Sequence, residues 1–117
     1  DPPTAVERAV GFIEETGRRH GVEQPIQMTV ATTNGSSVWA FRYSSEGASR
    51  SLFHSTATET LRAQYPDNLV LHELSDETRL IVSEPLGDLA GAWNEVPEST
   101  YVVVCEGEDE LRPFTPH

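Results

Sequence analysis

Hydrophobic residues recur at helical spacing near the start of the chain and predict an amphipathic helix over residues 4–20. Thr4 and Glu7 stand at the spacing of a capping box, which predicts that the helix begins at Thr4, after a lead-in turn at residues 1–3. Gly11 costs up to about 1 kcal/mol relative to alanine inside a helix, so it predicts close packing against another element. The expected buried face consists of Ala5, Val6, Ala9, Val10, Phe12 and Ile13.

An alternating pattern over residues 26–31 predicts a half-buried strand, and a second strand follows over residues 38–43. Asn34-Gly35 between them is typical of a two-residue type I′ turn, so the two strands should form a hairpin. The second strand is apolar on both faces, and we therefore expect it to lie between two layers. Its aromatic face carries Trp39, Phe41 and Tyr43.

The middle of the chain predicts shorter elements. A strand is expected around residues 52–54, and Thr56 with Glu59 forms a second capping box that opens a helix reaching about residue 65. Residues 67–78 are polar and read as a surface excursion. The residues expected to pin this excursion to the core are Leu69, Leu71 and Leu74.

The last third predicts two strands and an acidic tail. Residues 80–82 form a short apolar run closed by Ser83-Glu84, and residues 101–105 form a continuous apolar run typical of a strand buried on both faces. From residue 106 the composition turns acidic, and residues 106–117 are expected to be a solvated tail. One long helix with successive antiparallel strands indicates a single α+β unit, without linker or internal repeat.

Composition narrows the function classes. The 117 residues carry 8 basic and 19 acidic side chains, a net charge of −11, which argues against binding to nucleic acid or to an anionic membrane. All the basic residues are arginine, so lysine-dependent chemistry is excluded. No segment approaches the ~18 apolar residues of a membrane span, and no signal pattern precedes the helix, so we expect a cytoplasmic protein. Because residue 1 is Asp and not Met, we expect a processed chain or a piece of a longer one.

Few residues are candidates for chemistry. Cys105 is the one thiol, which excludes an internal disulfide, and its place at the end of an apolar strand favours a structural role. An independent cysteine hydrolase using Cys105 and His54 is a remaining alternative. No pair of histidines has metal-ligand spacing, so no metal site is expected. The sequence contains neither GxGxxG nor GxxxxGK[ST], and no cofactor is expected. The four histidines are His20, His54, His72 and His117.

Three further groups have a structural and a functional interpretation. Ser83-Glu84 ends a strand and could line a site, although local backbone bonding that turns the chain toward Pro85 is favoured. The aromatic face of residues 39–43 is interpreted as core in preference to a ligand-stacking platform. The acidic stretch is interpreted as a solvated end, since carboxylates without a geometric pattern repel one another. Its members are Glu106, Glu108, Asp109 and Glu110.

The order of these segments resembles the second half of a class II glutamine amidotransferase domain. In that family a hairpin precedes a strand ending in Ser-Glu or Ser-Asp, and a turn near a Val-Pro pair leads into a last strand. The resemblance covers residues 4–105, nearly the whole chain, but about half of the family's domain. The matching segments are the hairpin around Asn34-Gly35, its strand at residues 40–44, and residues 79–85, 93–97 and 101–105. The small stand-alone members, including γ-glutamyl amidohydrolases, look most similar.

This resemblance implies an N-terminal-nucleophile hydrolase, in which a four-layer αββα sandwich holds two antiparallel sheets between helices. It implies cleavage of the γ-amide of glutamine or of a γ-glutamyl conjugate through a cysteine thioester. The nucleophile would be a cysteine at the mature N-terminus, with its own α-amino group as base. No catalytic residue carries over, because Asp1 is not a nucleophile and Asn34-Gly35 fits a scaffold turn. Residues 1–117 are then the C-terminal half of the domain, and the N-terminal half is their partner.

The alternative is a self-contained acidic α+β binding or interaction module without catalytic activity. The fragment hypothesis predicts a large exposed apolar face on the first helix or on the aromatic side of the hairpin, whereas the module should cover its sheets. The chain alone lacks the nucleophile under the first hypothesis and should be inactive. Sequence leaves open the substrate, a homo-oligomer, and which loops touch substrate. Residues 83–88 are the expected candidates for such a loop.

Overall fold

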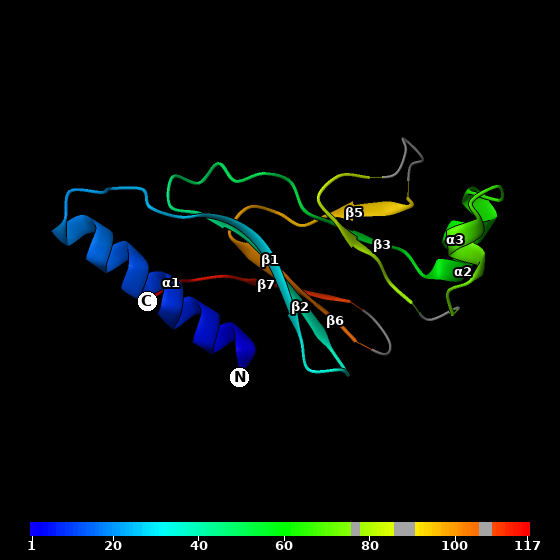
Figure 1. Ribbon diagram of the computed structural model, residues 1–117, viewed down its shortest axis with the longest axis horizontal. Coiled ribbons are helices and arrows are strands. Elements are labelled where there is room, and N and C mark those ends of the chain that lie inside the picture. Colours follow the sequence, from blue (N-terminus) through cyan, green and yellow to red (C-terminus); the bar gives the residue numbers. More distant parts are fainter. Residues whose placement is uncertain (76–77, 86–90, 106–108) are drawn as a thin grey trace. The chain divides into compact units, whose positions relative to one another are not determined.

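The computed structural model describes residues 1–75, 78–85, 91–105 and 109–117 (Figure 1). The chain divides into two compact units, which are described separately. The first unit comprises Asp1–Arg50 and Val96–His117, and the second comprises Ser51–Glu95. Both contain antiparallel sheet and helix, so the predicted mixed α and β fold with antiparallel sheets is confirmed.

The first unit consists of one long helix and a four-stranded antiparallel sheet. The strand order is β1-β2-β6-β7, so β1 and β7 are the edges of the sheet and β2 and β6 its centre. The hairpin partners β1 and β2 are paired from Gln27–Ser44 to Thr33–Val38. The elements are α1 (Pro2–Arg19), β1 (Gln27–Thr33), β2 (Val38–Ser44), β6 (Thr100–Val104) and β7 (Glu110–Pro113).

The helix α1 begins two residues earlier than its capping-box pattern predicted. Asp1 is the N-cap, and its carboxylate accepts a hydrogen bond of 2.8 Å from the backbone N–H of Thr4. Pro2 and Pro3 occupy the first helical positions, where a missing N–H costs nothing. The predicted capping box is therefore wrong. Glu7 instead accepts a hydrogen bond of 2.6 Å from the backbone N–H of Thr115.

The helix also buries a narrower face than predicted. Val10 is buried and Val6 packs against the core, whereas Phe12 is 72% exposed and Ile13 is 43% exposed. At about 100° per residue, Phe12 points to nearly the opposite side from Val10, so one flat sheet cannot cover both. The close packing predicted at Gly11 is confirmed. A Cβ at this position would lie 2.5 Å from the carbonyl oxygen of His117.

The hairpin is confirmed, but its turn differs from the prediction. Thr33 pairs with Val38, so four residues and not two connect the strands. Gly35 adopts a positive φ of 92°, whereas Asn34 does not. The Asn34 side chain accepts hydrogen bonds of 2.9 Å from the backbone N–H groups of Ser36 and Ser37. This side-chain turn replaces the second positive-φ residue that a type I′ turn requires.

The core of the first unit lies between α1 and one face of the sheet. Phe41 is fully buried, and its ring centroid lies 5.3 Å from that of Tyr101 and 5.4 Å from that of Phe114. Tyr101 lies opposite Phe41 on the neighbouring strand. The partly buried side chains packed on this cluster are Val6, Ile26, Met28, Trp39, Tyr43 and Val103. The structural interpretation of the aromatic face at residues 39–43 is therefore confirmed.

The C-terminal segment is not the solvated tail that its composition predicted. Glu110–Pro113 forms β7, which pairs with β6, and Phe114 is only 3% exposed. On β7, Arg112 and Glu110 form an ion pair of 2.9 Å at the surface. Pairing with a buried strand thus compensates for the polar composition of β7. Residues 106–108 of the predicted acidic stretch lie outside the described residues.

The described residues of the second unit form a three-stranded antiparallel sheet, in the order β4-β3-β5, and two short helices. Its core cluster contains Leu61, Leu71 and Ala92. The sequence did not predict the strand at residues 93–95, because three residues are too few to show an alternation of apolar and polar side chains. The elements are β3 (Phe53–Ser55), α2 (Thr58–Gln64), α3 (Leu69–His72), β4 (Ile81–Val82) and β5 (Trp93–Glu95).

Two predictions for the second unit need correction. The helix α2 begins at Thr58, its N-cap is Ala57, and no side chain caps it, so the predicted capping box of Thr56 and Glu59 is wrong. The predicted excursion contains the helix α3, in which Leu71 is buried but Leu69 is 77% exposed. Asn68 caps α3 by accepting hydrogen bonds from the N–H groups of Val70 and Leu71. At about 100° per residue, Leu69 and Leu71 point to nearly opposite sides of this helix, so one core cannot bury both.

Candidate functional site

The residues that the sequence singled out for chemistry are distributed over both units. Cys105 follows β6 in the first unit and is exposed, so it lacks the packing expected of a structural cysteine. His54 is buried in β3 of the second unit. Within the described ranges, no three His, Cys, Asp or Glu side chains are grouped so that they could hold a metal ion. None of the described helices has the length and apolar character needed to cross a membrane.

Ser83-Glu84 lies at the surface directly after β4. The carbonyl oxygen of Ser83 accepts a hydrogen bond of 2.8 Å from the Ser51 hydroxyl, so this end of the sheet is tied to the start of the second unit. This bond spans 32 positions of the chain and uses the Ser83 backbone. Local bonding by the Ser83 and Glu84 side chains therefore stays a prediction. The neighbouring residues 86–90, part of the loop expected to touch substrate, lie outside the described residues.

A polar cluster joins α1 to the sheet. The Glu14 carboxylate on α1 accepts hydrogen bonds of 2.6 Å from the Tyr43 hydroxyl and 2.7 Å from the Ser45 hydroxyl. Burial, followed by the hydrogen bond to Glu14 and the charge of that carboxylate, raises the pKa of Tyr43 to about 12. The neutral phenol therefore holds the helix to the end of β2.

We expect the contribution of this phenol to stability to disappear at high pH. The folded-state pKa of Tyr43 lies above its ordinary value of 10.0, so the contribution is complete below pH 10 and is lost as the pH rises toward 12. Urea unfolding between pH 9 and 12 should show a steeper loss of stability for the wild type than for Tyr43→Phe. Tyr65→Phe, in the second unit, is the matched control and should keep the wild-type slope. Equal slopes for wild type and Tyr43→Phe would contradict this assignment.

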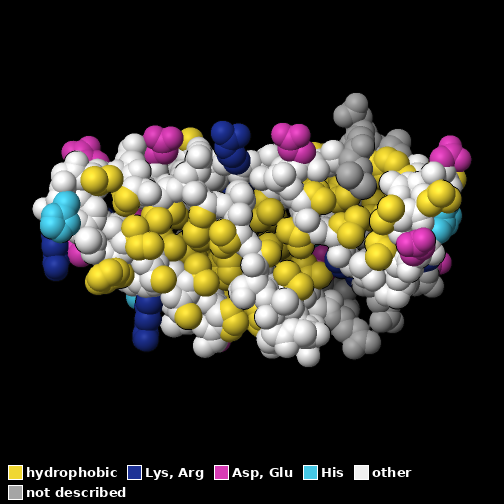
Figure 2. Space-filling model, in the orientation of Figure 1, with side chains coloured by type: hydrophobic (Ala, Val, Ile, Leu, Met, Phe, Trp, Pro, Cys, Tyr) yellow, Lys and Arg dark blue, Asp and Glu magenta, His cyan; other side chains and the backbone are white. Residues whose placement is uncertain are grey.

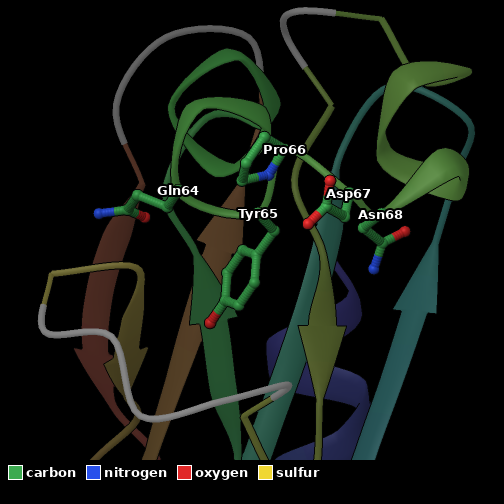
Figure 3. A pocket seen from close by; sticks show the side chains of 5 residues that line it. All are labelled: Gln64, Tyr65, Pro66, Asp67 and Asn68. Carbon is green, nitrogen blue, oxygen red and sulfur yellow. The ribbon is translucent and has the colours of Figure 1, made fainter.

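A shallow pocket lies at the end of α2 (Figure 3). It has a volume of about 460 Å³ and is lined by the consecutive residues Gln64, Tyr65, Pro66, Asp67 and Asn68. Tyr65 accepts a hydrogen bond of 3.1 Å from the indole of Trp93, and Asn68 caps α3. Figure 3 shows Gln64 extending to the side opposite Asp67 and Asn68, so the polar groups do not converge on one point. This pocket therefore does not have the geometry of an active site.

An apolar groove beside α1 is the better candidate, as an interaction site. It has a volume of about 340 Å³ and is formed where residues 20–25 fold back along the end of the helix. The N–H of Val22 donates a 2.7 Å hydrogen bond to the carbonyl of Gly17, and Gly21 turns the chain with a φ of 79°. A Cβ on Gly17 would lie only 2.8 Å from the Val22 carbonyl oxygen. The lining residues are Phe12, Ile13, Thr16, Gly17, His20, Val22 and Pro25.

The groove is bordered by large apolar side chains that reach the solvent. Phe12 is 72% exposed, Val22 49% and Ile13 43%. Figure 2 shows hydrophobic side chains at the surface where α1 lies, toward the left of the view. Contiguous exposed apolar surface bordered by polar groups commonly marks an interaction site. The apolar face that the fragment hypothesis predicted on the first helix is thus present.

Sequence reasoning missed the groove for a physical reason. The pattern places Phe12 and Ile13 on the apolar side of the helix, but it does not tell which apolar residues the sheet covers. The available signal was the width of that pattern, since residues 5, 6, 9, 10, 12 and 13 span more of the helix than one neighbour buries.

The two antiparallel sheets and their helices define a mixed α and β fold. Among solved structures, the chain is similar to a protein from Silicibacter pomeroyi described as a glutamine aminotransferase class-II domain protein, with a TM-score of 0.75 and 24% identity. The match covers 100% of this chain and 45% of that chain, so this chain spans less than half of that protein's length. No protein-family model matches the sequence, and no curated protein does. The fold is therefore similar to part of a class II domain.

Proposed function

We propose that this chain is the C-terminal portion of a class II glutamine amidotransferase-like hydrolase. The complete enzyme cleaves the γ-amide of glutamine or of a γ-glutamyl conjugate through a cysteine thioester. The nucleophile belongs to the N-terminal half, and its α-amino group acts as the base. The observation that carries the proposal is the match of the whole chain to 45% of a glutamine aminotransferase class-II domain protein.

The local structure supports this assignment. The hairpin of β1 and β2, the short strand β4 before Ser83-Glu84, and the turn at Val96-Pro97 before β6 occur in the order that the sequence resemblance requires. The four-layer αββα sandwich would be completed by the N-terminal half, which adds the elements that this chain does not contain. In this proposal the present chain supplies scaffold, and its own residues hold neither nucleophile nor base.

The apolar groove beside α1 gives the scaffold role a physical basis. Covering an exposed phenylalanine and isoleucine contributes about 1.5–3 kcal/mol per fully buried side chain. Exposing the side chains of Phe12 and Ile13 to water is unfavourable, and packing them against a helix or strand of the rest of the domain is favourable. The proposed partner of the groove is therefore an apolar segment of the same domain. The substrate is bound by the complete enzyme.

The test is a glutaminase assay of two proteins: this 117-residue chain, and the same chain extended by its upstream residues. The chain alone should release no ammonia from glutamine or from a γ-glutamyl amide above background. The extended protein should release it, and Cys→Ala at the first cysteine of the extension should abolish the activity. Activity of the isolated chain, or activity that survives the Cys→Ala change, would overturn the proposal.

A dye that fluoresces on apolar surface gives a second readout. It should bind the isolated chain strongly and the extended protein weakly, because the extension covers the groove. Phe12→Ser is a useful control, since it should reduce dye binding to the isolated chain alone. An extended protein that is folded and inactive and still binds the dye as the isolated chain does would support the alternative, a non-catalytic binding module.

A further inference from the structure

The chain passes twice between its two units, and both passages are fastened to one arginine of the first unit. It leaves the first unit after Arg50 and returns at Val96. Arg42, on β2, donates a 2.7 Å hydrogen bond to the carbonyl of Val96 in the returning segment. The same guanidinium donates to the carbonyl of Ser49 at 3.3 Å and to its hydroxyl at 3.2 Å, in the outgoing segment.

Glu98 joins the two segments from the other side. Its carboxylate accepts hydrogen bonds from the backbone N–H of Ser49 at 3.0 Å and from the Ser49 hydroxyl. It also lies 3.6 Å from the Nε of Arg42 and 3.5 Å from the Ser44 hydroxyl. That hydroxyl accepts a 2.8 Å bond from the backbone N–H of Ala48. The returning segment therefore holds the outgoing one directly at two residues, Ser44 and Ser49.

The ion pair of Arg42 and Glu98 is partly buried, unlike an ion pair at the surface. The Arg42 side chain is 13% exposed and that of Glu98 is 27% exposed, so solvent screens their attraction less than it would at the surface. Burial opposes ionisation of Glu98, but the Ser49 hydrogen bonds and the charge of Arg42 outweigh it and lower the pKa of this carboxyl. The pair is therefore fully charged at neutral pH.

The next residue of the returning segment is held in an unfavourable conformation. Ser99 has a φ of 55°, in the left-handed region, and is the one non-glycine residue with positive φ in the described part of the chain. Such a conformation persists where surrounding contacts impose it. The Ser99 carbonyl accepts a 2.9 Å bond from the Phe114 N–H, and the Glu98 carbonyl accepts a 3.1 Å bond from the Thr100 hydroxyl.

We propose that Arg42 and Glu98 form a clamp that binds the outgoing segment 44–50 to the returning segment 96–99. The two connections to the second unit are then held together at one place. With the clamp closed, the second unit is attached at one fastened point. With the clamp open, both connections are released together, and the turn at Ser99 can relax. This inference does not depend on the proposed function, since it rests on contacts within the first unit.

The pairing of β2 with β6 does not require this arginine side chain. Backbone hydrogen bonds hold the register of Arg42 opposite Thr100, and the aromatic core lies on the other face of the sheet. Losing the clamp should therefore loosen the two segments and leave the sheet in place. Hydrogen bonds to charged groups are strong enough that this loss should change the local opening equilibrium by about tenfold or more.

Amide hydrogen exchange of the full chain tests the clamp. In Arg42→Met, amides of both segments should exchange about tenfold faster or more, while amides in β1, in residues 38–43 of β2 and in β6 keep their wild-type rates. Arg50→Met is the matched control, because Arg50 is exposed, lies in the outgoing segment and undergoes the same charge change. It should leave all rates unchanged. Acceleration in only one segment, in neither, or equally in the strands would overturn the proposal.

Two further variants keep the test decisive if Arg42→Met does not fold. Arg42→Lys retains the charge but cannot reach the Val96 and Ser49 carbonyls with separate arms of a planar fork, so it should still open both segments. Glu98→Gln retains an acceptor for Ser49 but loses the ionic attraction, and it should accelerate both segments to a smaller extent. Wild-type exchange in both of these variants would exclude the clamp.

Discussion

Replacing Phe41 with alanine is expected to lower the free energy of unfolding by about 3–5 kcal/mol, which is a large part of the roughly 5–15 kcal/mol by which folded proteins are stable. Phe41 is fully buried at the centre of the aromatic cluster, and its ring lies against those of Tyr101 and Phe114. Alanine would leave a cavity among these rings. The rigid sheet cannot close that cavity, because β2 is paired on both sides.

The matched control is Phe12→Ala, the same substitution on α1. Phe12 is 72% exposed, so its loss removes little buried surface and should change stability by no more than about 0.5 kcal/mol. Urea unfolding followed by circular dichroism measures both variants. Similar destabilisation by the two substitutions would contradict the division of the helix face into a buried side and an open groove.

Leu71→Ala is expected to destabilise the second unit by about 2–5 kcal/mol. Leu71 is 1% exposed and belongs to the core cluster with Leu61 and Ala92. Leu69→Ala, two residues away on the same short helix, should change stability by no more than about 0.5 kcal/mol because Leu69 is 77% exposed. The two variants have the same composition, so any difference between them reports position alone.

Fluorescence offers a suitable measurement, since Trp93 packs against this cluster. With Trp39→Phe present in every protein compared, Trp93 is the one tryptophan. Its emission should shift on unfolding at a lower urea concentration in Leu71→Ala than in the protein without that change, and at an unchanged concentration in Leu69→Ala. A reversed order would mean that α3 presents its other side to the core. The sequence alone does not decide between these orientations, since it expected both leucines to pin the segment.

The sequence pattern predicted correctly those helices and strands whose formation depends mainly on their own side chains. The alternation around Met28 predicted β1, the apolar run ending at Cys105 predicted β6, and Asn34-Gly35 predicted a hairpin. The fold class followed from the order of these elements. The first helix was also evident, although its start depended on Asp1 and not on Thr4. An N-cap depends on one side chain reaching one N–H group, and several nearby residues can offer that bond.

Elements that depend on distant partners were missed or misread. The strand β7 looked like a tail because Glu110 and Arg112 give it a polar composition, yet pairing with β6 holds it in the sheet. The site showed the same limit. The resemblance placed the chemistry outside this chain and predicted an exposed apolar face on the first helix, but only the fold showed that Pro25 returns to the helix and completes a groove there.

The sequence by itself determined that this protein is an acidic antiparallel α and β chain with one amphipathic helix, a hairpin and no lysine chemistry. Only the tertiary structure decided which apolar residues are covered, where the C-terminal segment pairs, and that Arg42 reaches Val96 across 54 positions of the chain. Periodicity records what a segment can bury within a few residues of itself. Whether a residue is buried, and whether a charge is paired, depends on the segments that folding brings against it.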